Sequence, residues 1–146
     1  MLFEKKLLVD EELQLVEAAI GEAEKITSGE IRVAIKGSCR CDPLLEAQKT
    51  FHRLGMDKTE QKNGVLILIA VTQKKFAIVG DEGIDRFMGQ EGWNSVRDIL
   101  SSRFAQGRFA EGLVEAVHEV SRVLADHFPP VEGDRNELPN TVVEEH

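Results

Sequence analysis

The feature that most constrains this fold is a run of seven apolar residues, from Val65 to Val71, near the middle of the chain. The run is too short to cross a bilayer, which takes about 20 apolar residues. Its content of Val and Ile favours a strand. Because no polar residue interrupts the run, both faces of this strand are expected to be buried. A sheet covered by helices on both sides meets this requirement, which predicts the α/β class.

Two more strands are expected beside this run. Residues 31–35 alternate between apolar and other side chains, and residues 76–79 form a further short apolar stretch. A helix is predicted over residues 42–55, because an Asp followed by Pro is typical of a helix start. This strand-helix-strand order makes the first two strands parallel. Residues 72–75 are short enough for an antiparallel hairpin to the third strand.

Helical periodicity predicts three further helices. Apolar residues recur at spacings of three and four over residues 10–26, from about residue 91 to 104, and over residues 109–128. Pro129 and Pro130 end the last of these helices. We therefore predict a three-layer α/β/α sandwich in which helices cover both faces of a small mixed sheet, made of a parallel pair of strands and an antiparallel hairpin strand.

The composition favours one domain without a nucleic-acid partner. The chain has 146 residues, a length typical of one domain, and 18 basic against 26 acidic residues give a net charge of −8. The basic residues are scattered among acidic ones, whereas nucleic-acid binding requires a clustered basic face. Residues 131–146 are polar and acidic and lack periodicity, so we expect a domain over residues 1–130 and a disordered tail.

The N-terminal residues and the cysteines indicate the compartment. Only three apolar residues follow Lys5 and Lys6, so we expect neither a signal peptide nor a membrane anchor. Cys39 and Cys41 are too close for a relaxed disulfide, and no second pair completes a structural zinc site. Reduced thiols in a cytoplasmic, monomeric protein are therefore expected.

Five polar residues lie where the predicted strands begin or end. Glu30 and Asn63 precede the first two strands, and Asp81, Glu82 and Asp85 follow the third. The predicted strand directions place all five at one edge of the sheet. Clustered carboxylates repel one another unless a cation lies between them, and oxygen ligands of this kind suit Ca²⁺, with Mg²⁺ as the alternative. The sequence thus predicts a divalent-cation site at this edge.

A structural role for the same acidic residues stays open. Glu30 and Asp81 can cap helix ends or accept backbone N–H bonds in glycine-rich turns. An EF-hand loop is excluded, because a loop that starts at Asp81 has Arg86 in place of the glycine at position 6 and Gly92 in place of the glutamate at position 12.

Four short motifs, taken in order, resemble a known family. They are Thr27-Ser28-Gly29-Glu30-Ile31, Asn63-Gly64-Val65-Leu66-Ile67, Val79-Gly80-Asp81-Glu82-Gly83-Ile84, and Phe104-Ala105-Gln106-Gly107-Arg108-Phe109 followed by Gly112-Leu113. This pattern resembles the TPM domain over residues 10–128. The resemblance implies an α/β/α sandwich, calcium binding as reported for some members, and the acid phosphatase activity ascribed to a plant member. It also implies that the acidic residues Asp81, Glu82 and Asp85 hold the cation.

Two functions are compatible with these residues. The first is a Ca²⁺-binding module that engages a protein partner. The alternative is a metal-dependent acid phosphatase in which the same cation activates water and Arg86 or Arg108 holds the phosphate. The sequence contains no P-loop, and no arginine lies six residues after Cys39 or Cys41, as the cysteine-phosphatase loop requires. A structural assembly domain without either activity is the third possibility.

Overall fold

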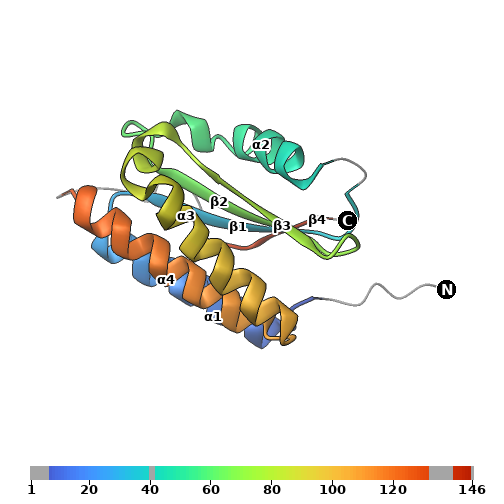
Figure 1. The fold of residues 1–146 in the computed structure, drawn as a ribbon. Coiled ribbons are helices and arrows are strands. Elements are labelled where there is room, and N and C mark those ends of the chain that lie inside the picture. Colours follow the sequence, from blue (N-terminus) through green and yellow to red (C-terminus); the bar gives the residue numbers. More distant parts are fainter. Residues whose placement is uncertain (1–6, 40–41, 132–139, 146) are drawn as a thin grey trace.

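The computed structural model describes residues 7–39, 42–131 and 140–145. The elements follow one another as α1 (Asp10–Ile26), β1 (Glu30–Lys36), α2 (Pro43–Arg53), the 3₁₀ helix η1 (Met56–Lys58), β2 (Gly64–Ala70), β3 (Lys75–Gly80), α3 (Glu82–Ala105), α4 (Phe109–His127) and β4 (Val143–Glu145). Helix α2 covers one face of the sheet, and α1, α3 and α4 cover the other (Figure 1). The predicted three-layer α/β/α fold is thereby confirmed.

The sheet has the order β3-β2-β1-β4. Strands β1 and β2 are parallel, and β2 and β3 form an antiparallel hairpin, as the sequence predicted. The fourth strand pairs with β1 in the parallel sense. The sheet is therefore mixed, and β4 forms its second edge.

Strand β4 corrects the expectation of a disordered tail. Val143–Glu145 pair with residues 34–36 of β1. The Lys36 Nζ lies 3.3 Å from an oxygen of Glu46 and 3.6 Å from an oxygen of Glu145, so it links β4 to α2. A three-residue strand is too short to produce a recognisable period, which is why the sequence did not reveal it. The expectation for residues 132–139 and 146 falls outside the described residues.

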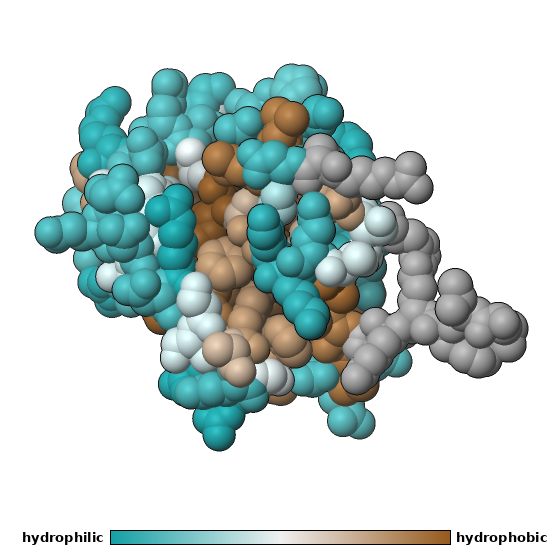
Figure 2. All heavy atoms as spheres, turned by 45° about the vertical axis from the view of Figure 1, so that its right-hand side comes forward, coloured by the Kyte–Doolittle hydropathy of each residue, from teal (hydrophilic) through white to brown (hydrophobic). Residues whose placement is uncertain are grey.

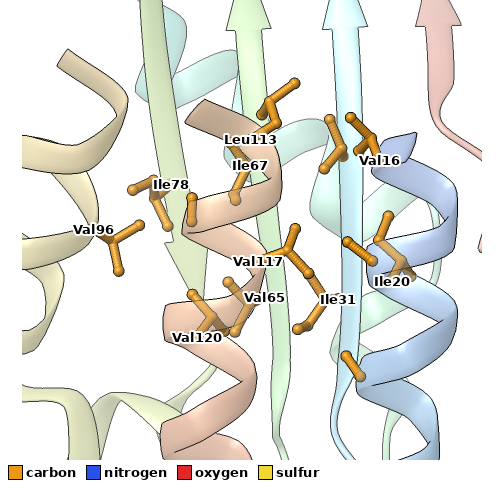
Figure 3. Close-up of a cluster of buried hydrophobic side chains, with 14 of the residues drawn as sticks. Val16, Ile20, Ile31, Val65, Ile67, Ile78, Val96, Leu113, Val117 and Val120 are labelled. Atoms are coloured by element: carbon orange, nitrogen blue, oxygen red, sulfur yellow. The ribbon is translucent and has the colours of Figure 1, made fainter. Parts of the chain in front are cut away.

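The hydrophobic core lies on both sides of β2. All seven residues of this strand are buried. Val65, Ile67 and Ile69 face the larger cluster under α1, α3 and α4, while Leu66 and Leu68 face α2. In Figure 3, side chains from α4 lie over β2 and side chains from α1 lie over β1. Each fully buried aliphatic side chain contributes roughly 1.5–3 kcal/mol, so this strand anchors both layers.

Helix α3 begins earlier than predicted. The sequence placed residues 81–85 in a loop and the helix start near residue 91, whereas the helix starts at Glu82 with Asp81 as its N-cap. Gly89 interrupts the helix with φ 61° and ψ −179°, a conformation that favours glycine. Gly83 and Gly89 weaken the helical signal in the first turns, because glycine has a poor helix propensity. The acidic residues thus lie on a helix start rather than in a free loop.

Candidate functional site

The polar residues at the strand ends are held by the register of the sheet. Glu30 lies opposite Gly64, and Val65 lies opposite Gly80. The backbone N–H of Glu30 donates to the carbonyl of Asn63 at 3.3 Å, and that of Asp81 donates to the carbonyl of Gly64 at 3.0 Å. The backbones of residues 30, 63 and 81 therefore form one row across the sheet, which we call the strand-end row. This convergence agrees with the sequence prediction.

Asp81 supplies the carboxylate at the β3 end of this row. Its Oδ1 accepts a hydrogen bond from the backbone N–H of Glu82 at 2.8 Å and caps α3. Its Oδ2 is buried and has no hydrogen-bond partner among the described residues. A buried polar atom without a partner costs roughly 1–3 kcal/mol. The helix N-terminus offsets part of this cost, because its partial positive charge stabilises a carboxylate.

Neutral oxygens surround the entry of β2. Asn63 is only 2% exposed, and its backbone N–H donates to Thr59 Oγ1 at 3.3 Å. The Oγ of Ser28 accepts hydrogen bonds from Asn63 Nδ2 at 3.4 Å and from Gln61 Nε2 at 3.2 Å. This hydroxyl therefore joins the end of α1 to the loop before β2. Neither Ser28 nor Gln61 was predicted from the sequence as a site residue, although Ser28 belongs to the motif Thr27-Ser28-Gly29-Glu30-Ile31.

Gly83 allows the first turn of α3 to approach this loop. A Cβ at Gly83 would lie 2.3 Å from the carbonyl oxygen of Gln61 and 2.5 Å from that of Lys62. The N–H of Ile84 donates to the carbonyl of Lys62 at 3.3 Å. Only glycine permits so close an approach to a backbone. The contact fixes the position of Asp81 relative to Asn63.

The other two acidic residues after β3 have different surroundings. Asp85 lies one helical turn beyond Asp81, and its Oδ1 accepts a hydrogen bond from Trp93 Nε1 at 2.7 Å. The Trp93 ring in turn packs on Gly80, where a Cβ would lie 2.3 Å from the ring. Asp85 thus holds the indole that covers the end of β3. Glu82 is exposed at the helix start.

Glu30 lies beside a buried cation of the same strand. Both Glu30 and Arg32 are 6% exposed, and residues two apart on a strand share a face. Burial lowers the pKa of the Arg32 guanidinium, and the negative charge of Glu30 opposes that change. Arg32 Nη2 donates to the carbonyl of Thr141 at 3.3 Å. Glu30 therefore balances a buried arginine, a role that sequence reasoning did not foresee.

The five predicted ligands do not form one carboxylate cluster. Among residues 7–39, 42–131 and 140–145, no three His, Cys, Asp or Glu side chains are grouped in a way that could hold a metal ion. Within the strand-end row, the carboxylate of Glu30 balances Arg32, which leaves the carboxylate of Asp81 together with neutral oxygens. Such a donor set suits a hard cation that binds weakly.

Arg108 is remote from this row. It is the N-cap of α4 and follows the C-terminal end of α3, whereas Asp81 precedes the first residue of α3. Residues 90–105 alone span about 24 Å at the helical rise of 1.5 Å per residue. The phosphate-binding role considered for Arg108 is therefore incompatible with the fold.

Two further sequence expectations concern the thiols and the membrane. Cys39 is buried, while Cys41 lies outside the described residues, so the expectation of reduced thiols stays a prediction. In the described part of the chain, we find no helix with the length and apolar character needed to span a bilayer.

Comparison with known proteins identifies the family. The TPM domain family matches residues 3–123. The solution structure of BA42 from the psychrophilic bacterium Bizionia argentinensis is similar over 99% of both chains, with 40% identity and a TM-score of 0.89.

More distant structures share the fold. The N-terminal domain of a P. gingivalis protein covers 84% of this chain and 81% of its own, with 20% identity and a TM-score of 0.71. The N-terminal domain of cg2496 from Corynebacterium glutamicum covers 95% and 82%, with 14% identity and a TM-score of 0.63. No functionally curated protein matches the sequence. The family match and the similarity to BA42 show that this chain belongs to the TPM domain family.

Proposed function

We propose that this TPM domain is a divalent-cation binding module that takes up Ca²⁺ at the strand-end row. The observation that carries the proposal is the buried Oδ2 of Asp81, which has no hydrogen-bond partner among the described residues. A bound cation would compensate this oxygen in the way that a hydrogen bond would. Asn63 and Ser28 lie on the neighbouring segments and contribute the neutral oxygens.

The chemistry of these donors favours Ca²⁺ over Mg²⁺. Ca²⁺ accepts six to eight oxygen ligands in flexible geometry, including carbonyl and amide oxygens, whereas Mg²⁺ requires near-octahedral geometry and keeps several waters. A site with one buried carboxylate is weak, because affinity rises with the number of charged ligands. The positive end of α3 weakens it further. We expect a dissociation constant of roughly 10⁻⁴ to 10⁻³ M.

Exposed Glu82 gives the site a second, movable carboxylate. It lies next to Asp81 at the start of α3 and can turn toward a bound ion. In the proposed function, the ion also organises this edge of the sheet for a protein partner, because it supplies open coordination positions for a partner's oxygens.

An NMR titration of metal-stripped protein tests the proposal. Ca²⁺ is expected to shift the amides of residues 80–86 in a saturable way, together with those of Glu30 and Asn63. Mg²⁺ is expected to produce smaller shifts at the same positions. Shifts that stay unsaturated and confined to residues 131–146 would contradict the proposal, because they would report screening of an acidic segment.

The acid phosphatase alternative depends on the same ion. Arg108 is too distant to serve it, which leaves exposed Arg86 as its phosphate-binding candidate. Hydrolysis of p-nitrophenyl phosphate by wild type and by Asp81→Asn distinguishes the two functions. Ca²⁺-dependent turnover that the substitution abolishes would favour the phosphatase, whereas a module that only binds Ca²⁺ gives no turnover in either protein.

A further inference from the structure

An apolar pocket of about 690 Å³ opens at the opposite end of the sheet from Asp81. It lies where the β2–β3 hairpin meets the end of α3 and the start of α4. Ala70 and Lys75, the residue pair next to the turn of the hairpin, both line it. Figure 2 shows hydrophobic surface between hydrophilic regions on the side of the molecule that this view brings forward. Pockets of 300–1,000 Å³ are the size that holds small organic ligands.

Three phenylalanine rings form much of the pocket wall. The ring of Phe104 lies 5.8 Å from that of Phe76 in an edge-on arrangement and 5.1 Å from that of Phe109. All three side chains are only partly buried although they pack on the main core. Their arrangement leaves apolar ring surface open to the cavity. Packing of the rings on one another preorganises this wall for an apolar ligand.

Two lysines give the pocket a positive charge. Lys74 and Lys75 line it, both are exposed, and neither ammonium group forms an ion pair within the described part of the chain. Among the residues that the structure describes, none that lines the pocket is acidic, although the whole chain carries a net charge of −8. The pocket therefore combines an apolar wall with a local excess of positive charge.

We infer that this pocket binds a free amphipathic carboxylate, namely an aliphatic chain that ends in a carboxylate group. The chain lies against the three phenylalanines, and the carboxylate pairs with Lys74 and Lys75. Charge complementarity selects an anion over a neutral or cationic ligand of equal length. The size of the cavity favours a small molecule over a segment of protein. This site is separate from the strand-end row and does not depend on Ca²⁺.

Decanoate, used below its micelle concentration, is a suitable probe. Titration followed by NMR is expected to give saturable shifts of Phe76, Phe104 and Phe109 at a stoichiometry of one. Decanol and decyltrimethylammonium have the same chain without the negative charge and are expected to bind more weakly. Equal binding of all three probes would overturn the assignment of an anion site.

Two adjacent serines offer a matched pair of variants. Ser101 and Ser102 are both exposed on α3, but only Ser101 lines the pocket. Ser101→Trp is expected to obstruct the cavity and to abolish decanoate binding, while Ser102→Trp keeps the affinity of wild type. Equal loss in both variants, or no loss in either, would contradict the pocket as the binding site.

Removal of the lysine charges tests the polar end of the site. The double variant Lys74→Asn/Lys75→Gln is expected to weaken decanoate binding by about two- to tenfold, the range for two partly exposed ion pairs. Asn suits position 74 because Lys74 has φ 55°. Lys49→Gln/Lys58→Gln removes the same charge elsewhere and is the control. Equal weakening in the two double variants would indicate a net-charge effect and would overturn the role of Lys74 and Lys75.

If decanoate fails to bind while anionic vesicles or an apolar peptide shift the same phenylalanines, the inference is wrong. Such a result would assign the pocket to a membrane surface or to a protein partner.

Discussion

At the scale of single residues, the ability of each carboxylate to bind a cation depends on the partners that it already has. The carboxylate of Asp85 accepts from Trp93, and Glu30 lies beside buried Arg32. Asp81 uses one oxygen for the helix cap and leaves the other buried. Three acidic residues that look equivalent in the sequence thus have three different roles, and the proposed cation binding rests on Asp81.

The ion pair between Arg103 of α3 and Glu115 of α4 provides a pH-dependent test of the packing between these two helices. Arg103 donates to the two oxygens of Glu115 at 2.9 and 3.1 Å. This hydrogen bonding lowers the pKa of Glu115 from 4.5, and burial opposes the change. A carboxylate with a lowered pKa in the folded state stabilises the protein above its unfolded-state pKa, and the stabilisation is lost as the pH falls through the folded-state value.

We therefore expect Glu115→Gln to lower the Tm by no more than a few degrees at pH 7, because the pair is partly exposed. The difference from wild type should shrink as the pH falls below the ordinary value of 4.5. Thermal unfolding from pH 7 to pH 2.5 measures this, with exposed Glu91→Gln as the control. A Tm difference that does not change with pH would contradict the ion pair.

At the scale of secondary-structure elements, the start of α3 is the critical feature. Glycine at position 83 lets the helix approach the carbonyl oxygens of residues 61 and 62, and the same contact positions Asp81. Helix propensity did not indicate this start, because Gly83 and Gly89 interrupt the helical pattern of the sequence. The structure shows that tertiary contacts, rather than propensity, decide where the helix begins.

Two glycines of α3 test this interpretation. Gly83→Ala is expected to destabilise the fold by about 1–3 kcal/mol, because the new methyl group meets backbone oxygens that cannot move away easily. Gly92→Ala places its methyl group 3.3 Å from Cβ and Cε of Met88, a much wider approach than the 2.3 Å at Gly83. It should be neutral or stabilise by up to about 1 kcal/mol through helix propensity. Urea unfolding compares the two variants, and equal effects would contradict the close approach at Gly83.

The helices and strands in which apolar residues form a clear pattern were predicted from the sequence, and those without such a pattern were missed. The unbroken apolar run of β2 indicated burial on both faces, and every residue of that strand is buried. The strand-helix-strand order and the antiparallel hairpin then placed Glu30, Asn63 and Asp81 in one row, which the register confirms. The direction of each side chain could not be predicted, because it depends on partners distant in the sequence. Strand β4 was missed because three residues produce no recognisable period and its pairing with β1 is a long-range contact.

At the scale of the whole molecule, the two ends of the sheet differ in chemistry. One end carries the polar strand-end row, and the other carries the aromatic pocket with its two lysines. Strand β4 closes one edge of the sheet and brings buried Val142 under α1, where its N–H donates to Glu17 Oε1 at 3.2 Å. Residues 142–145 therefore belong to the folded unit.

Deletion of residues 140–146 is expected to destabilise the protein by roughly 2–3 kcal/mol, mainly through the lost burial of Val142. The deletion also exposes the edge of β1 and should promote self-association. Urea unfolding and size-exclusion chromatography measure the two effects. Deletion of His146 alone, which lies beyond β4, is the control. Unchanged stability after the longer deletion would contradict the role of β4.

The most direct test of the proposed function is a calorimetric titration of Ca²⁺ into wild type, Asp81→Asn and Asp42→Asn. Both aspartates are N-caps, Asp81 on α3 and Asp42 on α2, and Asn preserves a cap while it removes the charge. We predict that Asp81→Asn loses saturable Ca²⁺ binding and that Asp42→Asn retains the dissociation constant of wild type. Equal Ca²⁺ binding by all three proteins would contradict a cation site at Asp81.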